Sequence, residues 1–227
     1  LVVCLGVAGA THAPWADALR QSVPEFHRFF VESDAYTALL GAHGGLPGAV
    51  VAIGTGSVGM AEGADGQRRL VGGWGFPSGD EASGAWMGLR AVAHAEQASD
   101  GRRPESSLSR AVVQAVGDAG LRAWVVRADQ ARYASLAPLV LAQVHADGAA
   151  RSIVVDAAAE AARLAMALDP DGALPLAWCG GLAAPLQPFL PQELLVRSRA
   201  PLADAATGAL RLAARRLAQQ FSETLLA

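Results

Sequence analysis

The sequence predicts an α/β protein made of two α/β segments. The chain has 227 residues, of which 52% are apolar and 17% charged, so it can bury a substantial core. Residues 1–45 alternate between strand-like and helix-like stretches, whereas residues 46–227 begin with three short strands and continue mainly as helices. The glycine-rich stretch 41–48 separates the two patterns. We therefore assign 1–45 to a first domain and 46–227 to a second.

The N-terminal part predicts a strand–helix–strand–helix unit. The apolar run Leu1–Gly6 indicates a buried strand, and Pro14–Arg20 follows as a short helix with proline in its first turn. Phe26–Glu32 predicts a second strand, after which Ser33-Asp34 caps a helix that runs from Ala35 to about Gly41. Because strands separated by helices usually pair in parallel, we expect a parallel sheet here.

The second part opens with a three-strand meander. The strands are expected at Ala49–Ile53, Ser57–Glu62 and Arg68–Gly72. The first two are joined by Gly54-Thr55-Gly56, and the last two by the Ala64-Asp65-Gly66 turn, in which Asp-Gly is a strong hairpin signal.

The remainder of the second part is mostly helical, with further strands near its end. The expected elements are a helix to about Ala98, a polar loop at Asp100–Ser107, several helices up to Ala167, a stop at Asp169–Gly172, strands at Leu174–Cys179 and Glu193–Val196, and an amphipathic helix from Asp204 to about Phe221. We expect this last helix to pack back on the first domain.

Composition excludes several classes of function. The net charge of -3 lacks the basic excess that marks a nucleic-acid surface. All 18 basic residues are arginine, so no Walker A loop, protein-kinase lysine or pyridoxal Schiff base can form within this segment. The apolar opening run lacks a basic leader and is too short to span a bilayer. We expect a cytoplasmic protein with neither nucleic acid nor membrane as a partner.

Cysteines and histidines do not show metal-ligand spacing. Cys4 and Cys179 are far apart in sequence, which favours free thiols in the cytosol. The five histidines form neither an HExxH motif nor a Cys/His pattern. We therefore expect no transition-metal site.

Two glycine-bearing turns are candidate phosphate sites. In Gly54-Thr55-Gly56-Ser57, glycine allows the backbone to approach a phosphate, and the threonine hydroxyl adds a donor. Gly180-Gly181 directly follows a strand, a position at which open α/β sheets bind nucleotides. Both patterns also fit an ordinary structural turn, so this alternative stays open.

The segment 72–84 places a tryptophan among glycines, ahead of two acidic residues. The exposed indole of Trp74 is suited to stacking on the apolar face of a sugar ring. Asp80-Glu81 is expected to open the next helix, with one carboxylate capping it and the other accepting hydrogen bonds from hydroxyl groups. The alternative is a simple loop with an N-capping acid.

Asp34 is a carboxylate at the end of a predicted strand, in the other part of the chain. A carboxylate at that position is a candidate base for a hydroxyl nucleophile. Helix capping alone would also explain it.

These motifs in this order resemble the BadF/BadG/BcrA/BcrD ATPase family, and within it the bacterial N-acetylglucosamine and glucosamine kinases. The resemblance covers essentially the whole chain, and its most specific part is the tryptophan-to-glycine block. The motifs that carry it are Leu5-Gly6-Val7-Ala8-Gly9-Ala10, Glu32-Ser33-Asp34-Ala35, Ile53-Gly54-Thr55-Gly56-Ser57, Val71-Gly72-Gly73-Trp74-Gly75, Gly79-Asp80-Glu81-Ala82-Ser83-Gly84, Cys179-Gly180-Gly181-Leu182 and Ala203-Asp204-Ala205-Ala206-Thr207-Gly208-Ala209.

The resemblance implies an actin-like, ribonuclease-H-like ATPase fold, with two α/β domains around a nucleotide cleft. It implies an ATP- and Mg²⁺-dependent kinase that phosphorylates a small amino sugar, and it allows a homodimer. Asp34 matches the family's catalytic base. Residues matched to ATP binding are Thr55, Gly56 and Ser57 in the second phosphate loop, with Gly180 and Gly181 in the adenosine motif. Residues matched to the sugar are Trp74, Gly75 and Asp80.

One departure from the family is large. The family begins with a glycine-rich first phosphate loop on a leading hairpin, and this sequence contains no such loop. We expect the first domain to be incomplete in this chain, with an upstream segment supplying the loop. The alternative is an inactive kinase that serves as a sugar-sensing domain. A further alternative within the family is the activator ATPase of a 2-hydroxyacyl-CoA dehydratase or benzoyl-CoA reductase system. That activator binds an iron–sulfur cluster through paired cysteines, for which Cys4 and Cys179 are poorly placed.

Overall fold

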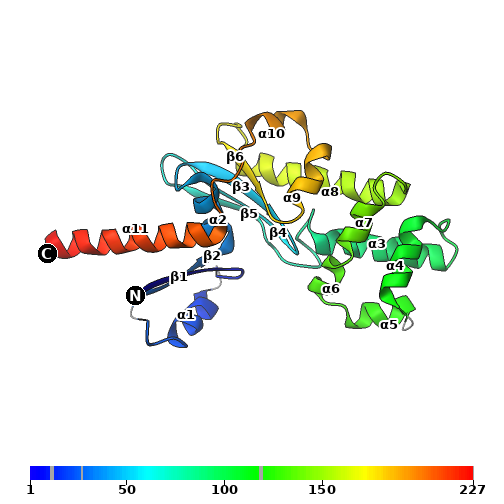
Figure 1. The fold of residues 1–227 in the computed structure, drawn as a ribbon, viewed down its shortest axis with the longest axis horizontal. Helices are drawn as coiled ribbons and strands as arrows, with labels where there is room; N and C mark the ends of the chain where they lie inside the picture. Colours follow the sequence, from blue (N-terminus) through cyan, green and yellow to red (C-terminus); the bar gives the residue numbers. More distant parts are fainter. Residues whose placement is uncertain (11–12, 27, 118–119, 227) are drawn as a thin grey trace.

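The computed structural model describes residues 1–10, 13–26, 28–117 and 120–226. Its N-terminal unit contains a parallel two-stranded sheet formed by β1 (Val2–Val7) and β2 (Arg28–Ser33), with α1 (Ala13–Gln21) between them in the chain. The next helix, α2 (Asp34–His43), begins at the residue that follows β2. Figure 1 shows this unit beside the larger second unit. The order strand–helix–strand–helix is confirmed, with ends shifted by one to two residues, but β1 is only partly buried and not the buried strand that its apolar run predicted.

The second unit is built on a four-stranded sheet with the order β5-β4-β3-β6. Its antiparallel meander consists of β3 (Gly48–Ile53), β4 (Ser57–Glu62) and β5 (Arg68–Gly72). The last strand, β6 (Leu176–Cys179), adds in parallel to β3 after a long helical excursion. These four strands occur where the sequence predicted them, although β6 begins two residues later than expected.

Helices make up most of the remaining chain. They are α3 (Gly84–Ser99), α4 (Ser107–Val116), α5 (Gly120–Arg127), α6 (Gln130–Ala134), α7 (Ala137–Ala142), α8 (Gly148–Leu168), α9 (Ala183–Leu186), the 3-10 turn η1 (Gln187–Phe189), α10 (Gln192–Arg197) and α11 (Ala205–Leu226). None of the helices in the described ranges is long and apolar enough to cross a membrane.

The central strand β3 is apolar along its whole length because both of its faces are buried. Its residues Ala49, Val51 and Ile53 belong to the larger core, which also contains the apolar sides of α3 and α8. Val50 points to the opposite face and packs with α2. A strand covered on both sides loses the polar–apolar alternation of a half-exposed strand, as this sequence shows.

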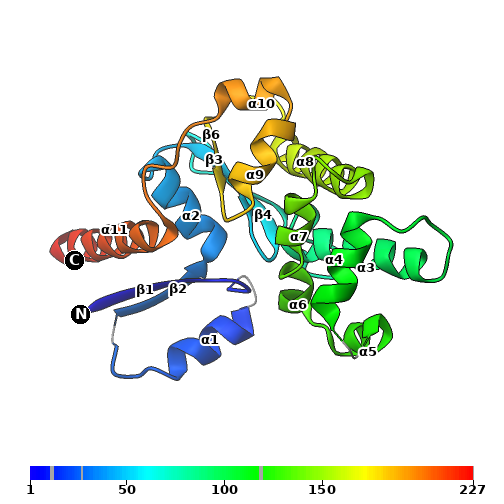
Figure 2. The same cartoon turned by 45° about the vertical axis from the view of Figure 1, so that its right-hand side comes forward.

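The helices α2 and α11 cross at close range because glycines stand where they meet. A Cβ atom at Gly208 would lie 1.8 Å from the carbonyl oxygen of Thr37, and one at Gly41 would lie 2.1 Å from that of Asp204. Figure 2 shows α11 running beside α2 and the two-stranded sheet, and α11 also contacts β1. The last helix therefore packs against the N-terminal unit, although it comes from the other end of the chain.

Two predictions about local structure are wrong. The segment Glu193–Val196 lies in α10 rather than in a strand, with the carbonyl of Pro191 accepting hydrogen bonds from the amides of Leu194 and Leu195. Leu194 is buried while Val196 is 69% exposed. A run of four residues is too short for its periodicity to separate strand from helix.

The second correction concerns the start of α3. Asp80 and Glu81 do not open this helix, which begins at Gly84. Its N-cap is Ser83, whose Oγ accepts a hydrogen bond from the Trp86 amide at 3.1 Å. Asp80 is therefore free of the capping role that the sequence suggested for one of the two acids.

Candidate active site

A cavity of about 650 Å³ lies where the two units meet. It is bordered by the start of α2, the turn between β3 and β4, the loop before α3, and the glycine that follows β6. Seven residues singled out from the sequence line it: Asp34, Thr55, Gly56, Ser57, Gly75, Asp80 and Gly180. Residues from four separate stretches of the chain thus converge on one space.

Asp34 brings an exposed carboxylate to this cavity from the first residue of α2. The N-cap of α2 is Ser33, whose Oγ accepts a hydrogen bond from the Tyr36 amide at 3.2 Å. Among the residues that the structure describes, the one hydrogen bond to the Asp34 carboxylate comes from the neighbouring Ala35 amide, which donates to Oδ1 at 2.9 Å. Because Ser33 supplies the cap, the helix does not need Asp34 for that purpose.

The turn between β3 and β4 is held by the first turn of α3. The Gly84 amide donates to the Gly54 carbonyl at 2.8 Å, and the Ala85 amide donates to the Thr55 carbonyl at 3.2 Å. Within the described residues, no hydrogen bond engages the backbone N–H of Thr55 or Gly56. A glycine turn with two uncommitted amides at a cavity wall can hold an anion such as a phosphate.

The Ser57 hydroxyl makes a hydrogen bond within the protein, although the sequence matched this residue to ATP binding. It is buried, and its Oγ donates to the Glu81 carbonyl at 2.5 Å. The hydroxyl therefore ties the turn to the loop before α3.

Asp80 is buried in the cavity wall, with only 5% of its surface exposed. Its backbone has a φ of 58°, a conformation that Asp tolerates better than most residues. The side-chain amide of Gln130 donates to Asp80 Oδ2 at 2.7 Å. A Cβ atom at Gly56 would lie 2.8 Å from that same oxygen, so Gly56 is required for the close approach of the carboxylate.

Gln130 is a cavity residue that the sequence analysis missed. It is the first residue of α6, directly after the N-cap Asp129. No motif surrounds it, and its partner Asp80 lies 50 residues earlier in the chain. Only the fold reveals this pair.

Trp74 is the clearest case of a predicted residue that lies outside the cavity lining. Its side chain is 86% exposed. The neighbouring Gly73 and Gly75 do line the cavity and have φ values of 69° and 88°. This loop therefore presents its backbone to the cavity, with the indole at its outer side.

Gly180 and Gly181 differ in their surroundings. Gly180 has a φ of 90°, and a Cβ atom there would lie 2.3 Å from the Ile53 carbonyl oxygen. This close approach seats the end of β6 against the end of β3. A Cβ atom at Gly181 would meet nothing within 4 Å, and Gly181 is not part of either cavity lining.

A second cavity of about 520 Å³ adjoins the first and shares Asp34 and Gly180 with it. Its remaining lining is mostly apolar and includes Trp178, Pro201 and Ala203. The two cavities differ in chemistry, because only the larger one is lined by the buried Asp80 and by the turn with the uncommitted amides.

Both cysteines are free thiols on strands. Cys4 lies in β1 and Cys179 ends β6. Burial raises the pKa of both thiols, so they are poor nucleophiles. The described residues contain no group of three or more His, Cys, Asp or Glu side chains that could hold a metal ion.

Comparison with known proteins identifies the family. The family model described as the BadF/BadG/BcrA/BcrD ATPase family matches residues 1–174. The chain belongs to this family. The resemblance carried by the glycine-rich motifs is thereby confirmed.

Relatives of this BadF/BadG/BcrA/BcrD ATPase include named sugar kinases. The glucosamine kinase of Vibrio cholerae is 33% identical over 93% of this chain and 72% of the relative. The N-acetyl-D-glucosamine kinase of Dictyostelium discoideum is 28% identical over 79% of this chain and 62% of the relative. The chain thus spans 72% of the length of the first relative and 62% of the length of the second.

Solved structures share its fold. A candidate N-acetylglucosamine kinase from Chromobacterium violaceum is 46% identical and covers 93% of this chain and 75% of its own, with a TM-score of 0.91. A second candidate N-acetylglucosamine kinase, from Porphyromonas gingivalis, has a TM-score of 0.66 at 20% identity, covering 92% of this chain and 75% of its own. The predicted actin-like ATPase fold is confirmed.

Proposed function

We propose that this chain is the greater part of an ATP-dependent kinase for an amino sugar, glucosamine or N-acetylglucosamine. The observation that carries the proposal is the convergence of Asp34, the Thr55–Gly56 amides and Asp80 on one cavity. These groups supply what a sugar kinase needs: a general base, backbone amides that bind phosphate, and a carboxylate that accepts hydrogen bonds from sugar hydroxyl groups. The named kinases among its relatives support the same substrate class.

In this proposal Asp34 acts as the general base. Its carboxylate is exposed to the cavity and is not needed to cap α2, so it can accept the proton of the attacking sugar hydroxyl. Positioning and charge stabilisation account for most of the catalysis of phosphoryl transfer, and one well-placed carboxylate is sufficient for the proton.

The nucleotide would lie along the turn between β3 and β4. The amides of Thr55 and Gly56 fit phosphate oxygens, and Gly180 would border the nucleoside in the adjoining cavity, with Gly181 next to it in the chain. The open space beside Gly54 and Gly181 fits a bound group, because a Cβ atom at either would meet nothing within 4 Å. ATP supplies the phosphoryl group, and Mg²⁺, held mainly by phosphates and water, would neutralise its charge.

The sugar would lie against Asp80 and the loop that contains Gly75. The buried carboxylate, fixed by Gln130, can accept hydrogen bonds from sugar hydroxyl groups. Trp74 at the outer side of the same loop would stack on the sugar when the loop moves inward over it. With the domain boundary that we predict at about residue 45, Asp34 and Asp80 would belong to different domains.

The test is to purify the full-length gene product and to measure its sugar-dependent release of ADP. Glucosamine, N-acetylglucosamine and a sugar-free blank are compared at saturating ATP and Mg²⁺. A kinase releases ADP only with one of the two sugars, in equal amount to sugar phosphate. ADP release without sugar would instead support the activator ATPase, and sugar binding without ADP release would support a sensing domain.

A further inference from the structure

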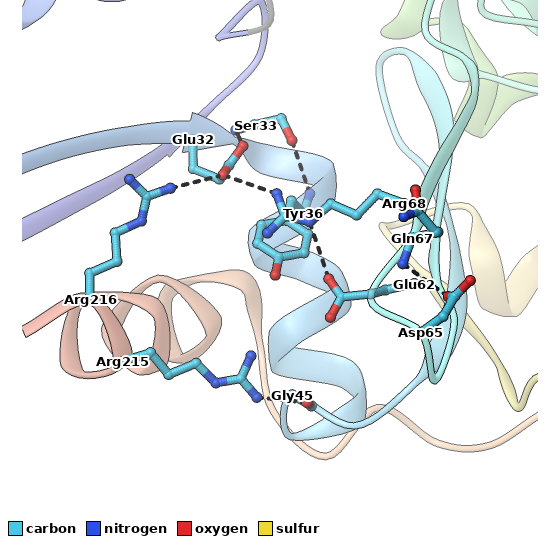
Figure 3. Close-up of polar contacts among 10 residues, drawn as sticks. All are labelled: Glu32, Ser33, Tyr36, Gly45, Glu62, Asp65, Gln67, Arg68, Arg215 and Arg216. Atoms are coloured by element: carbon cyan, nitrogen blue, oxygen red, sulfur yellow. Dashed lines mark hydrogen bonds and ion pairs between the residues drawn. The ribbon is translucent and has the colours of Figure 1, made fainter. Parts of the chain in front are cut away.

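Outside the cavity, a junction of charged side chains links the end of β2, just before Asp34, to the sheet of the second unit. Its centre is Glu32, the next-to-last residue of β2 and two residues before Asp34. Glu32 Oε2 lies 3.5 Å from Arg68 of β5 and 3.6 Å from Arg216 of α11. Figure 3 shows the two guanidinium groups approaching this carboxylate from opposite sides.

Arg68 is held in place by three contacts from different elements. Its Nε donates to Glu62 Oε2 at 3.2 Å, and these two residues are direct partners across β4 and β5. Its guanidinium carbon lies 3.4 Å from the centre of the Tyr36 ring of α2, and that ring is buried. Stacking on an aromatic face fixes the guanidinium plane, so its reach to Glu32 is pre-organised.

Glu32 links Arg68 to the residues at the start of α2. Its second oxygen, Oε1, accepts a hydrogen bond from the Ser33 amide at 3.0 Å. Ser33 in turn caps α2 through the Tyr36 amide. The sequence of contacts from Arg68 to Glu32 to Ser33 ends one residue before Asp34.

We propose that Arg68 is a positioning residue that fixes the Asp34 carboxylate relative to the phosphate-binding turn. The proposal rests on the proposed function of Asp34. Arg68 and the turn Gly54–Ser57 belong to the same sheet, whereas Asp34 belongs to the N-terminal unit. The junction therefore spans the two parts that must stay in register for phosphoryl transfer, and misplacement of about 1 Å is enough to slow a reaction strongly.

The experiment replaces Arg68 by glutamine and measures two independent properties. The first is steady-state kinetics with ATP and the amino sugar. We expect kcat to fall about tenfold while both KM values stay within about twofold, because substrate contacts are unchanged and only the base is displaced. The second is hydrogen exchange of the peptide that covers residues 33–37, which we expect to become faster without any change in the peptides of α8.

Arg69→Gln is the matched control. Arg69 is the next residue of β5 and is exposed, and no ion pair involves it within the described residues. The variant removes the same charge from the same strand, so normal kcat is expected. Glu32→Gln should reproduce the Arg68→Gln result. Because half-exposed ion pairs are screened by salt, kcat of the unaltered protein should fall towards that of Arg68→Gln as ionic strength rises.

The two measurements separate this proposal from the proposed function. Normal kcat and unchanged exchange in Arg68→Gln would overturn the positioning role. Equal loss in Arg69→Gln would also overturn it, because a general charge effect would then explain the result. If neither the unaltered protein nor any variant phosphorylates a sugar, the proposed function is wrong. Faster exchange at 33–37 in Arg68→Gln alone would then still show that Arg68 fixes this segment.

Discussion

Gln130 donates a 2.7 Å hydrogen bond from Nε2 to Asp80 Oδ2, although 50 residues separate the two in the chain. The pair lies beside Gly56, where any side chain on the turn would collide with the Asp80 carboxylate, because a Cβ atom at Gly56 would lie 2.8 Å from Asp80 Oδ2. A buried carboxylate needs such a partner, because an unpaired charge away from water is costly. The hydrogen bond also fixes the orientation of the carboxylate in the cavity wall.

Asp80→Asn is expected to weaken sugar binding selectively. Asparagine has the same shape and also tolerates a positive φ, so the loop keeps its conformation while the carboxylate charge is lost. Hydrogen bonds to a charged group contribute about 1.5–3 kcal/mol, so the KM for the sugar should rise about 10- to 100-fold. Steady-state kinetics with each substrate varied in turn checks this, with the KM for ATP expected to stay within about twofold.

Gln130→Leu is the companion variant for Asp80→Asn. It removes the donor to Asp80 and leaves the carboxylate in place, so a smaller rise in the sugar KM is expected. Equal losses for sugar and ATP in Asp80→Asn would indicate a misfolded loop rather than a lost sugar contact.

Asp34→Asn is expected to remove most of the turnover and leave the fold intact. Loss of a general base typically lowers the rate by about 10²–10⁴. The N-cap of α2 is Ser33, so the thermal midpoint should change little in this variant. Ser33→Ala provides the contrast, because loss of the cap typically costs about 1 kcal/mol of stability. Near-normal kcat in Asp34→Asn would show that this carboxylate is not the base.

Most of the architecture could be predicted from the sequence because local patterns agreed with the fold. Apolar strands next to glycine turns, as in Ala49–Ile53, are specified within a few residues. The strand prediction for Glu193–Val196 failed because a run of four residues is too short to show a period. The start of α3 failed because two acids and a serine all resemble N-caps, and only the backbone decides among Asp80, Glu81 and Ser83.

The candidate site was predictable where a motif carries it and was not predictable elsewhere. Gly56 and Asp80 were singled out by motif, and the structure adds that the Asp80 carboxylate occupies the space that a Gly56 side chain would need. Gln130 and Arg68 were missed because each acts through partners from distant parts of the chain, Asp80 and Glu32 respectively. Long-range pairs of this kind leave no periodic or local signal in a single sequence.

Gly208→Ala is expected to destabilise the protein strongly. The new methyl group would lie 1.8 Å from the Thr37 carbonyl oxygen, so α2 and α11 must separate. Overpacking typically costs about 1–3 kcal/mol, and a clash with backbone belongs at the upper end. Gly148→Ala in α8 is the control, because its methyl group would meet nothing within 4 Å. Urea unfolding measures both, and equal stability of the two variants would contradict the close crossing.

Asp147→Asn is expected to destabilise the protein at pH 7 but progressively less in acid. Burial alone would raise the pKa of Asp147, but hydrogen bonds from the amides of Leu108 and Ala150 and from the side chains of Ser106 and Ser107 outweigh it and hold the pKa well below its usual value. The stabilisation is therefore fully present above the unfolded-state pKa of about 3.9 and is lost as the pH falls below it. Loss of the charge-assisted hydrogen bonds should lower the free energy of unfolding by about 2 kcal/mol at pH 7. Urea unfolding of both proteins between pH 7 and pH 3 should show this difference shrinking below about pH 4. Asp171→Asn, which replaces an exposed acid, is the control and should not change the free energy of unfolding at any pH. For Asp147→Asn, a difference that stays constant over this range would mean that the Asp147 charge does not stabilise the ends of α4 and α8.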